Sequence, residues 1–200
     1  MMRILVVGAS GTVGQAAVNE LGRRHEIITA GRTSGDVQVD VTDDASVRAM
    51  FEKTGKVDAI VSMAGHVHFG PLATMTAEQF SKGLNGKLLG QVNLALIGQH
   101  HVNDNGSITL TSGVLDRDPI RKGANAAAVN GALGAFVKSA AIELERGLRI
   151  NVVSPGLLEE SVKKYDGFFP GHEPVSSARV GLAYAKSVEG GLTGQVIIIQ

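Results

Sequence analysis

The chain has 200 residues, carries 19 acidic and 19 basic side chains, and contains no cysteine. This length suits one domain with a sizeable core, and the zero net charge gives no attraction to nucleic acid or to anionic membranes. Without cysteine there is no disulfide, thiolate nucleophile or cysteine-bound metal. The apolar run before Gly8 is too short for a signal peptide, and no stretch is long enough to span a bilayer. By elimination we expect a cytoplasmic protein.

Short apolar segments alternate with longer amphipathic ones along the chain. We expect strands at 4–7, 26–30, 37–41, 59–62, 107–111, 149–153 and 195–199. Helices are expected at 13–23, 43–54, 76–101, 124–146 and 175–187. The helix at 76–101 opens with the spacing of a capping box between Thr76 and Gln79. Strands that alternate with helices predict an α/β fold, a Rossmann-like doubly wound parallel sheet of about seven strands with helices on both faces.

Glycines are concentrated where the first strand gives way to the first helix, in the sequence Gly-Ala-Ser-Gly-Thr-Val-Gly. Such glycines let the backbone approach a pyrophosphate, and the helix start offers unpaired N–H groups and a positive dipole end. A plain strand-to-helix turn needs fewer glycines. We therefore interpret residues 1–200 as a single NAD(P)-binding Rossmann-like domain, whose phosphate-binding turn comprises Gly8, Ser10, Gly11, Thr12, Val13 and Gly14.

A cation follows the second expected strand, where NAD-specific sites usually carry an acid. Arg32 lies there and precedes Thr33 and Ser34. A guanidinium with neighbouring hydroxyls suits a 2′-phosphate, so the pattern favours NADP as cofactor. NAD stays an alternative, because Asp36 lies nearby and because Arg32 could equally be a solvated surface side chain.

Further motifs follow in the order of one family: Asp40-Val41, Ser62-Met63-Ala64-Gly65, the segment 107–113, Asn151-Val152-Val153-Ser154-Pro155-Gly156 and the segment 193–197. With the glycine turn, they resemble the short-chain dehydrogenases/reductases over nearly the whole chain. The resemblance implies that the acid after the third strand holds the adenine and that the Pro-Gly motif lies beside the nicotinamide. To the cofactor site it thus adds Asp40, Val41, Ala64, Gly65, Pro155 and Gly156.

The catalytic pattern of that family is only partly matched. Active members use a serine, a Tyr-x-x-x-Lys pair on the next helix, and an asparagine on the preceding helix. Their tyrosine donates a proton to the carbonyl oxygen as hydride arrives. Ser112 resembles the serine, with its spacing off by one, whereas Ala126 aligns with the tyrosine, Asn130 with the lysine and Lys87 with the asparagine. The chain is identified as an atypical short member that lacks the Tyr-x-x-x-Lys pair.

Lys87 is the first candidate for a substitute proton donor, because its ammonium could reach the space left by Ala126. A surface helix lysine is the alternative. Asn130 could still hydrogen-bond the cofactor ribose through its neutral amide. His66 and His68 follow a strand end and could donate protons near neutral pH, or simply make local loop hydrogen bonds. No third ligand accompanies the histidines, so no metal site is expected.

The long segment 157–174 corresponds to the region that folds over substrate in the family. It contains Tyr165, which could act as a substitute acid although nothing in the sequence places it, and Phe168-Phe169-Pro170, which could form an apolar wall. Ser161 is a weak candidate for contact with the nicotinamide carboxamide.

Small residues recur every four positions at Ala127, Gly131 and Ala135. This stripe permits close approach of a helix. The family pairs such helices between subunits, which implies a homo-oligomer (dimer or tetramer), although packing on the domain's own sheet would explain the same residues.

Three functions remain open at this stage. The first is an NADP(H)-dependent oxidoreductase acting on a small carbonyl or alcohol, with Ser112, Lys87 and Asn130 in its catalytic site. The second is an inactive NAD(P)-binding sensor or regulatory protein, which the missing tyrosine and lysine favour. The third is an isomerase-like or dehydratase-like activity on the same fold. The retained serine and cleft-forming motifs favour the first, with a small-molecule substrate and without nucleic-acid or membrane partners.

Overall fold

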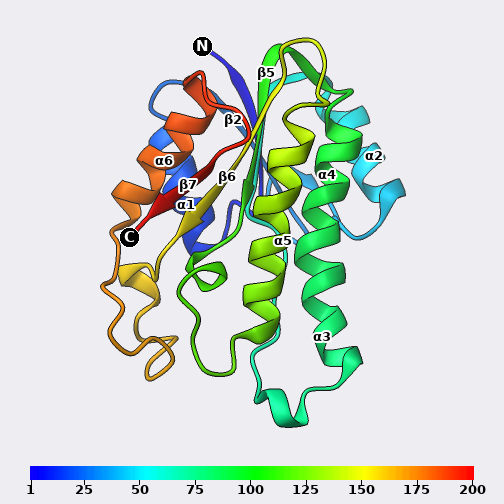
Figure 1. Cartoon of the computed structure of the whole chain (residues 1–200). Helices are drawn as coiled ribbons and strands as arrows, with labels where there is room; N and C mark the ends of the chain where they lie inside the picture. Colours follow the sequence, from blue (N-terminus) through cyan, green and yellow to red (C-terminus); the bar gives the residue numbers. More distant parts are fainter.

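The computed structural model describes residues 1–200, whose apolar segments form one seven-stranded sheet with the order β3-β2-β1-β4-β5-β6-β7. All neighbouring strands are parallel, and the predicted doubly wound, Rossmann-like fold is confirmed (Figure 1). The strands are β1 (Arg3–Val7), β2 (Glu26–Gly31), β3 (Val37–Gln38), β4 (Val57–Ser62), β5 (Val102–Thr111), β6 (Arg149–Pro155) and β7 (Val196–Ile199).

Helices cover both faces of the sheet (Figure 1). On one face α1 (Thr12–Leu21) packs against α6 (Ser177–Glu189), and on the other lie α2 (Asp44–Thr54), α4 (Gly90–Gly98) and α5 (Ala124–Ala140). The central strands are therefore buried on both sides, which is why they read as continuous apolar runs rather than as alternating ones. None of these helices combines the length and the apolar character needed to cross a bilayer.

The strand order reverses at β1, which has β2 on one side and β4 on the other. Ligands of open α/β sheets bind at such a switch point, beyond the carboxyl ends of the strands. Gly8, Met63, Ser112 and Gly156 directly follow β1, β4, β5 and β6, so all four lie at this edge of the sheet.

The segment expected to be one helix over 76–101 is instead divided into three helical pieces. Thr76 and Gln79 form the predicted capping box at the start of α3 (Ala77–Gly83). Leu84–Leu89 then forms a π-helix, and α4 begins at Gly90. Sequence reasoning misses this change because π-helices are rare and occur mostly as single turns inside longer α-helices. Such turns are frequent at functional sites, and this one carries Lys87.

The expected helix over 124–146 is also wrong at its end, since α5 stops at Ala140. Arg146 has a φ of 58°, a left-handed conformation that a continuing helix does not allow. The remaining boundaries agree within two residues except at two strands. Only Val37–Gln38 of the expected 37–41 pairs with β2, and β5 begins at Val102, where the polar sequence Asn-Asp-Asn-Gly hid its first half.

The small-residue stripe of α5 does not face the sheet. Val129, Leu133 and Val137 bury that side of the helix, whereas Gly131 and Ala135 are exposed. The interpretation that the stripe packs on the domain's own sheet is therefore wrong.

Candidate active site

The glycine turn after β1 forms a cradle of backbone. Gly8 has a φ of +91°, which favours glycine, and its N–H donates to the Ala30 carbonyl at 2.8 Å. A Cβ on Gly14 would clash with the Gly8 carbonyl oxygen and would lie 2.7 Å from the Ala9 oxygen. The amides of Thr12 and Val13 donate to no protein acceptor, and the helix start has no side-chain cap. These amides and the helix dipole are therefore free to bind an anion.

We expect Gly14→Ala to lower the free energy of unfolding by about 1–3 kcal/mol, because the added methyl group meets fixed backbone atoms. The same change should weaken binding of a dinucleotide, since the cradle must widen. Urea denaturation and calorimetric titration with NADPH measure the two effects. Gly191→Ala is the matched control, because nothing lies within 4 Å of a Cβ at that position. Equal effects of both substitutions would contradict the expectation.

A first cavity, of about 500 Å³, lies on the β2 side of the turn. Arg32 contributes to its wall, and its Nη2 donates to Asp40 Oδ2 at 2.9 Å. Hydrogen bonds from Thr42 and the nearby guanidinium lower the pKa of Asp40. The wall includes Gly8, Ser10, Gly11, Arg32, Thr33, Ser34, Asp40, Val41, Ala64 and Gly65.

Asp36, which left NAD open as an alternative, does not line this cavity. Its Oδ2 accepts hydrogen bonds from the Thr29 amide at 2.9 Å and from the Thr29 hydroxyl at 2.8 Å. These bonds lower the pKa of Asp36 below its ordinary value. The carboxylate is thus used to hold the loop after β2.

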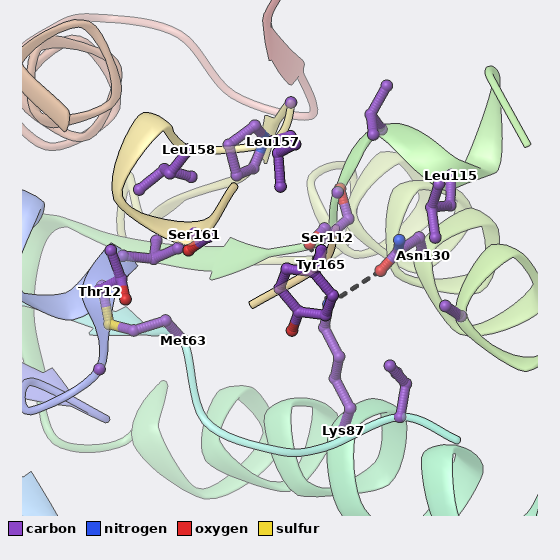
Figure 2. A pocket seen from close by; sticks show the side chains of 18 of the residues that line it. Thr12, Met63, Lys87, Ser112, Leu115, Asn130, Leu157, Leu158, Ser161 and Tyr165 are labelled. Carbon is purple, nitrogen blue, oxygen red and sulfur yellow. Dashed lines mark hydrogen bonds between the residues drawn. The ribbon is translucent and has the colours of Figure 1, made fainter. Parts of the chain in front are cut away.

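A second cavity, of about 350 Å³, opens on the other side of the turn (Figure 2). It brings together the predicted site residues Thr12, Val13, Gly14, Lys87, Ser112, Asn130, Pro155, Gly156 and Ser161. Its apolar wall includes Phe169 of the predicted wall, without Phe168 or Pro170, together with Val67, Phe69 and Leu115, which sequence reasoning did not single out. These residues follow strand ends, which is the one signal that could have found them.

Lys87 points into the protein and is not a surface helix lysine. Its Nζ donates to the Ser112 carbonyl oxygen at 2.9 Å and to Asn130 Oδ1 at 2.9 Å, the second of which is dashed in Figure 2. Burial lowers the pKa of Lys87 from 10.5 to about 8, against a smaller opposing effect of Asp116. A lysine with such a pKa can exchange a proton near neutral pH.

The fold places Lys87 here by bringing two segments close together. Gly65, with a φ of +107°, lies directly against the Lys87 Cα, where any Cβ on residue 65 would clash. The π-helix carries Lys87 opposite the end of β5. There its ammonium donates a hydrogen bond to Asn130 on α5.

The hydroxyl of Ser112, at the end of β5, makes no hydrogen bond within the protein. The Ser112 amide donates to the Val153 carbonyl at 2.9 Å, but its Oγ is buried without any hydrogen-bond partner. A buried polar atom without a partner costs free energy unless a ligand supplies one. Ser112 lines the second cavity, so a bound carbonyl or hydroxyl group would satisfy it.

The two histidines differ in position. His66 lines both cavities. His68 lines neither; its amide donates to Asn125 Oδ1 at 2.8 Å, and its ring folds over Gly70. His68 therefore lies outside both cavities.

Both cavities share the glycine turn, Met63, Gly65 and His66 in their walls. A diphosphate bound at the free amides would place one nucleoside in each cavity. At Gly14 the neighbouring backbone leaves no space for a side chain, so the main chain itself can lie close to the diphosphate. The residues therefore fit a nicotinamide dinucleotide. A parallel sheet with this turn at its switch point defines a Rossmann-like dinucleotide-binding domain.

Comparison with known proteins gives the family. The family described as Enoyl-(Acyl carrier protein) reductase matches residues 7–182, and the chain belongs to it within the short-chain dehydrogenase/reductase superfamily. Tetrahydroxynaphthalene reductase of Pyricularia oryzae is 26% identical over 243 residues, which cover 96% of this chain and 86% of that protein.

Solved structures agree with this assignment. The crystal structure of protein lin1944 from Listeria innocua has 51% sequence identity and a TM-score of 0.98, with all of both chains covered. A small-chain dehydrogenase in complex with NADPH has 27% identity and a TM-score of 0.86, with 99% of this chain and 96% of that chain covered.

Proposed function

We propose that this protein is an NADP(H)-dependent oxidoreductase that acts on a small carbonyl or alcohol through a non-standard catalytic site of Ser112, Lys87 and Asn130. The observation that carries the proposal is the buried Lys87 ammonium, held by the Ser112 carbonyl oxygen and by Asn130 in the cavity beside the glycine turn. The positions that align with the family's tyrosine and lysine, both on α5, hold Ala126 and Asn130. The titratable group of this site is therefore Lys87, which lies on the π-helix.

Each residue of the proposed site has a separate role. When bound, the reduced nicotinamide would supply a hydride to the carbonyl carbon. Ser112 Oγ donates a hydrogen bond to the carbonyl oxygen, because it has no other partner. Lys87 holds at Nζ the proton that the reduction consumes. Asn130 fixes that ammonium through its Oδ1, and apolar residues such as Phe69 and Leu115 exclude water.

The decisive experiment follows the loss of NADPH absorbance with a panel of aldehydes, ketones and quinones. Turnover that falls in Ser112→Ala supports an oxidoreductase. Ala126, which cannot replace the family's tyrosine, favours a second candidate, an inactive NADP(H) sensor. Tight NADPH binding without turnover of any compound in the panel would favour this sensor.

The choice of NADP over NAD depends on Arg32. Nη2 of its guanidinium is paired with Asp40. Its Nη1 and Nε remain available to a 2′-phosphate in the first cavity. We expect Arg32→Ala to weaken NADPH binding by about ten- to a hundredfold, as for loss of a charged hydrogen bond, and to weaken NADH binding far less.

Calorimetric titration with both cofactors measures this preference. Arg23→Ala is the matched control, because its side chain is also 69% exposed and is paired with Glu20 away from the cavity. Equal losses for both cofactors in Arg32→Ala would contradict the assignment of NADP, as would tighter binding of NADH by the unaltered protein.

We also propose a homodimer that pairs α4 and α5 between subunits. Leu89 at the end of the π-helix and Leu96 on α4 are exposed, as are Gly131 and Ala135 on α5. Light scattering at a monomeric mass would exclude the dimer.

A further inference from the structure

Tyr165 lies in the second cavity although it comes from the segment between β6 and α6. It lines the cavity together with Lys87, Ser112 and Ala126, and an adjoining cavity of about 390 Å³ is again lined by Tyr165, Lys87 and Ser112. Figure 2 shows its ring in the middle of the cavity. The two ends of the segment that carries it are joined by a parallel bridge between Leu158 and Val175.

Aromatic contacts hold the ring in this position. The Tyr165 ring centroid lies 5.8 Å from that of Phe169 and 6.1 Å from that of Phe69, in tilted or edge-to-face arrangements that aromatic pairs prefer. Phe69 follows β4 and Phe169 follows β6, so the ring is packed between two loops of the cavity wall. Packing against these two phenylalanines therefore fixes the position of the Tyr165 ring.

Tyr165 is also the only tyrosine with a free hydroxyl. The chain has two tyrosines, and the hydroxyl of Tyr184 is buried in the core at 2.7 Å from the hydroxyl of Thr111. The hydroxyl of Tyr165 has no protein partner. From α5 the cavity wall includes Ala126 and Asn130, neither of which carries an acidic group.

We propose that Tyr165 is the catalytic acid of this site. The inference rests on the proposed function: the phenol O–H bond breaks and the proton passes to the carbonyl oxygen as a hydride from the nicotinamide joins the carbonyl carbon. The resulting phenolate takes a proton from Lys87 Nζ, and solvent then restores the ammonium. Ketone and reduced nicotinamide become alcohol and oxidised nicotinamide, so atoms and electrons balance.

The first test compares Tyr165→Phe with Tyr184→Phe in the full-length protein. Tyr165→Phe keeps the ring contacts with Phe69 and Phe169 but removes the hydroxyl, so kcat should fall by about 10²–10⁴-fold with little change in NADPH affinity. Tyr184→Phe makes the same chemical change outside the cavity and should leave kcat nearly unchanged.

The second test needs no turnover. Nitration with tetranitromethane should modify Tyr165 and spare the buried Tyr184, and mass spectrometry identifies the site. The nitrophenol is a chromophore that titrates near neutral pH, where Lys87 is largely charged. Its titration should move to higher pH in Lys87→Met, because Lys87 lines the same cavity and an ammonium there favours the phenolate.

Two results would overturn the inference alone: a kcat of Tyr165→Phe equal to that of the unaltered protein, or a nitrophenol titration that is the same with and without Lys87. Unaltered protein that binds NADPH and reduces no carbonyl would instead overturn the proposed function, and this inference with it.

Discussion

Lys87→Met is expected to lower kcat by about 10²–10⁴-fold, the usual cost of losing a positioned proton donor, and to change NADPH affinity far less. Methionine fills a similar volume but holds no proton. In the unaltered protein the rate of carbonyl reduction should fall above about pH 8, where Lys87 loses its proton. The residual rate of Lys87→Met should lack this step. Lys138→Met on the exposed side of α5 is the control, and an equal loss there would contradict the assignment.

The same residue makes the stability depend on pH in a definite direction. The pKa of Lys87 is about 8 in the folded protein and 10.5 when unperturbed. Between these values the unfolded chain binds more protons than the folded one, so the free energy of unfolding rises with pH. The full rise is up to about 3 kcal/mol. Urea denaturation at about pH 7 and about pH 10 should show this rise in the unaltered protein and not in Lys87→Met.

The fold and the position of the glycine turn could be predicted because they depend on local patterns. Apolar runs mark the buried strands, and Gly8 and Gly14 are required by a backbone geometry that any side chain would disturb. The thirteen predicted cofactor residues all lie in the walls of the two cavities. Whether each of them touches NADP stays a prediction until the complex is measured.

The arrangement of the proposed catalytic residues could not be predicted to the same extent, because it depends on contacts between side chains of different elements. Sequence alignment placed Lys87 and Asn130 on different helices, but only the structure joins them at 2.9 Å. The sequence predicts one continuous helix where the π-helix carries Lys87, since π-helices are rare. Tyr165 comes from a segment without long helices or strands, where no period fixes the direction of a side chain.

The family resemblance implies that lysine and asparagine have exchanged helices, and such an exchange predicts a reciprocal variant. Asn130→Lys alone would place two ammonium groups together in a buried site. We expect it to destabilise the protein by about 3–5 kcal/mol, as for other uncompensated buried charges. Lys87→Asn combined with Asn130→Lys restores one amide and one ammonium, in the arrangement that the family resemblance implies.

The double variant should therefore be more stable than the sum of the two single changes by about 1–3 kcal/mol, the usual size of coupling between contacting residues. Urea denaturation of all four proteins gives this coupling energy directly. If the single changes simply add, Lys87 and Asn130 do not act as a pair, and the hydrogen bond between them does not hold the ammonium. If they couple as expected, the position of the charge depends on which helix supplies it. The proton source of the site can then be moved between α5 and the π-helix without changing the fold.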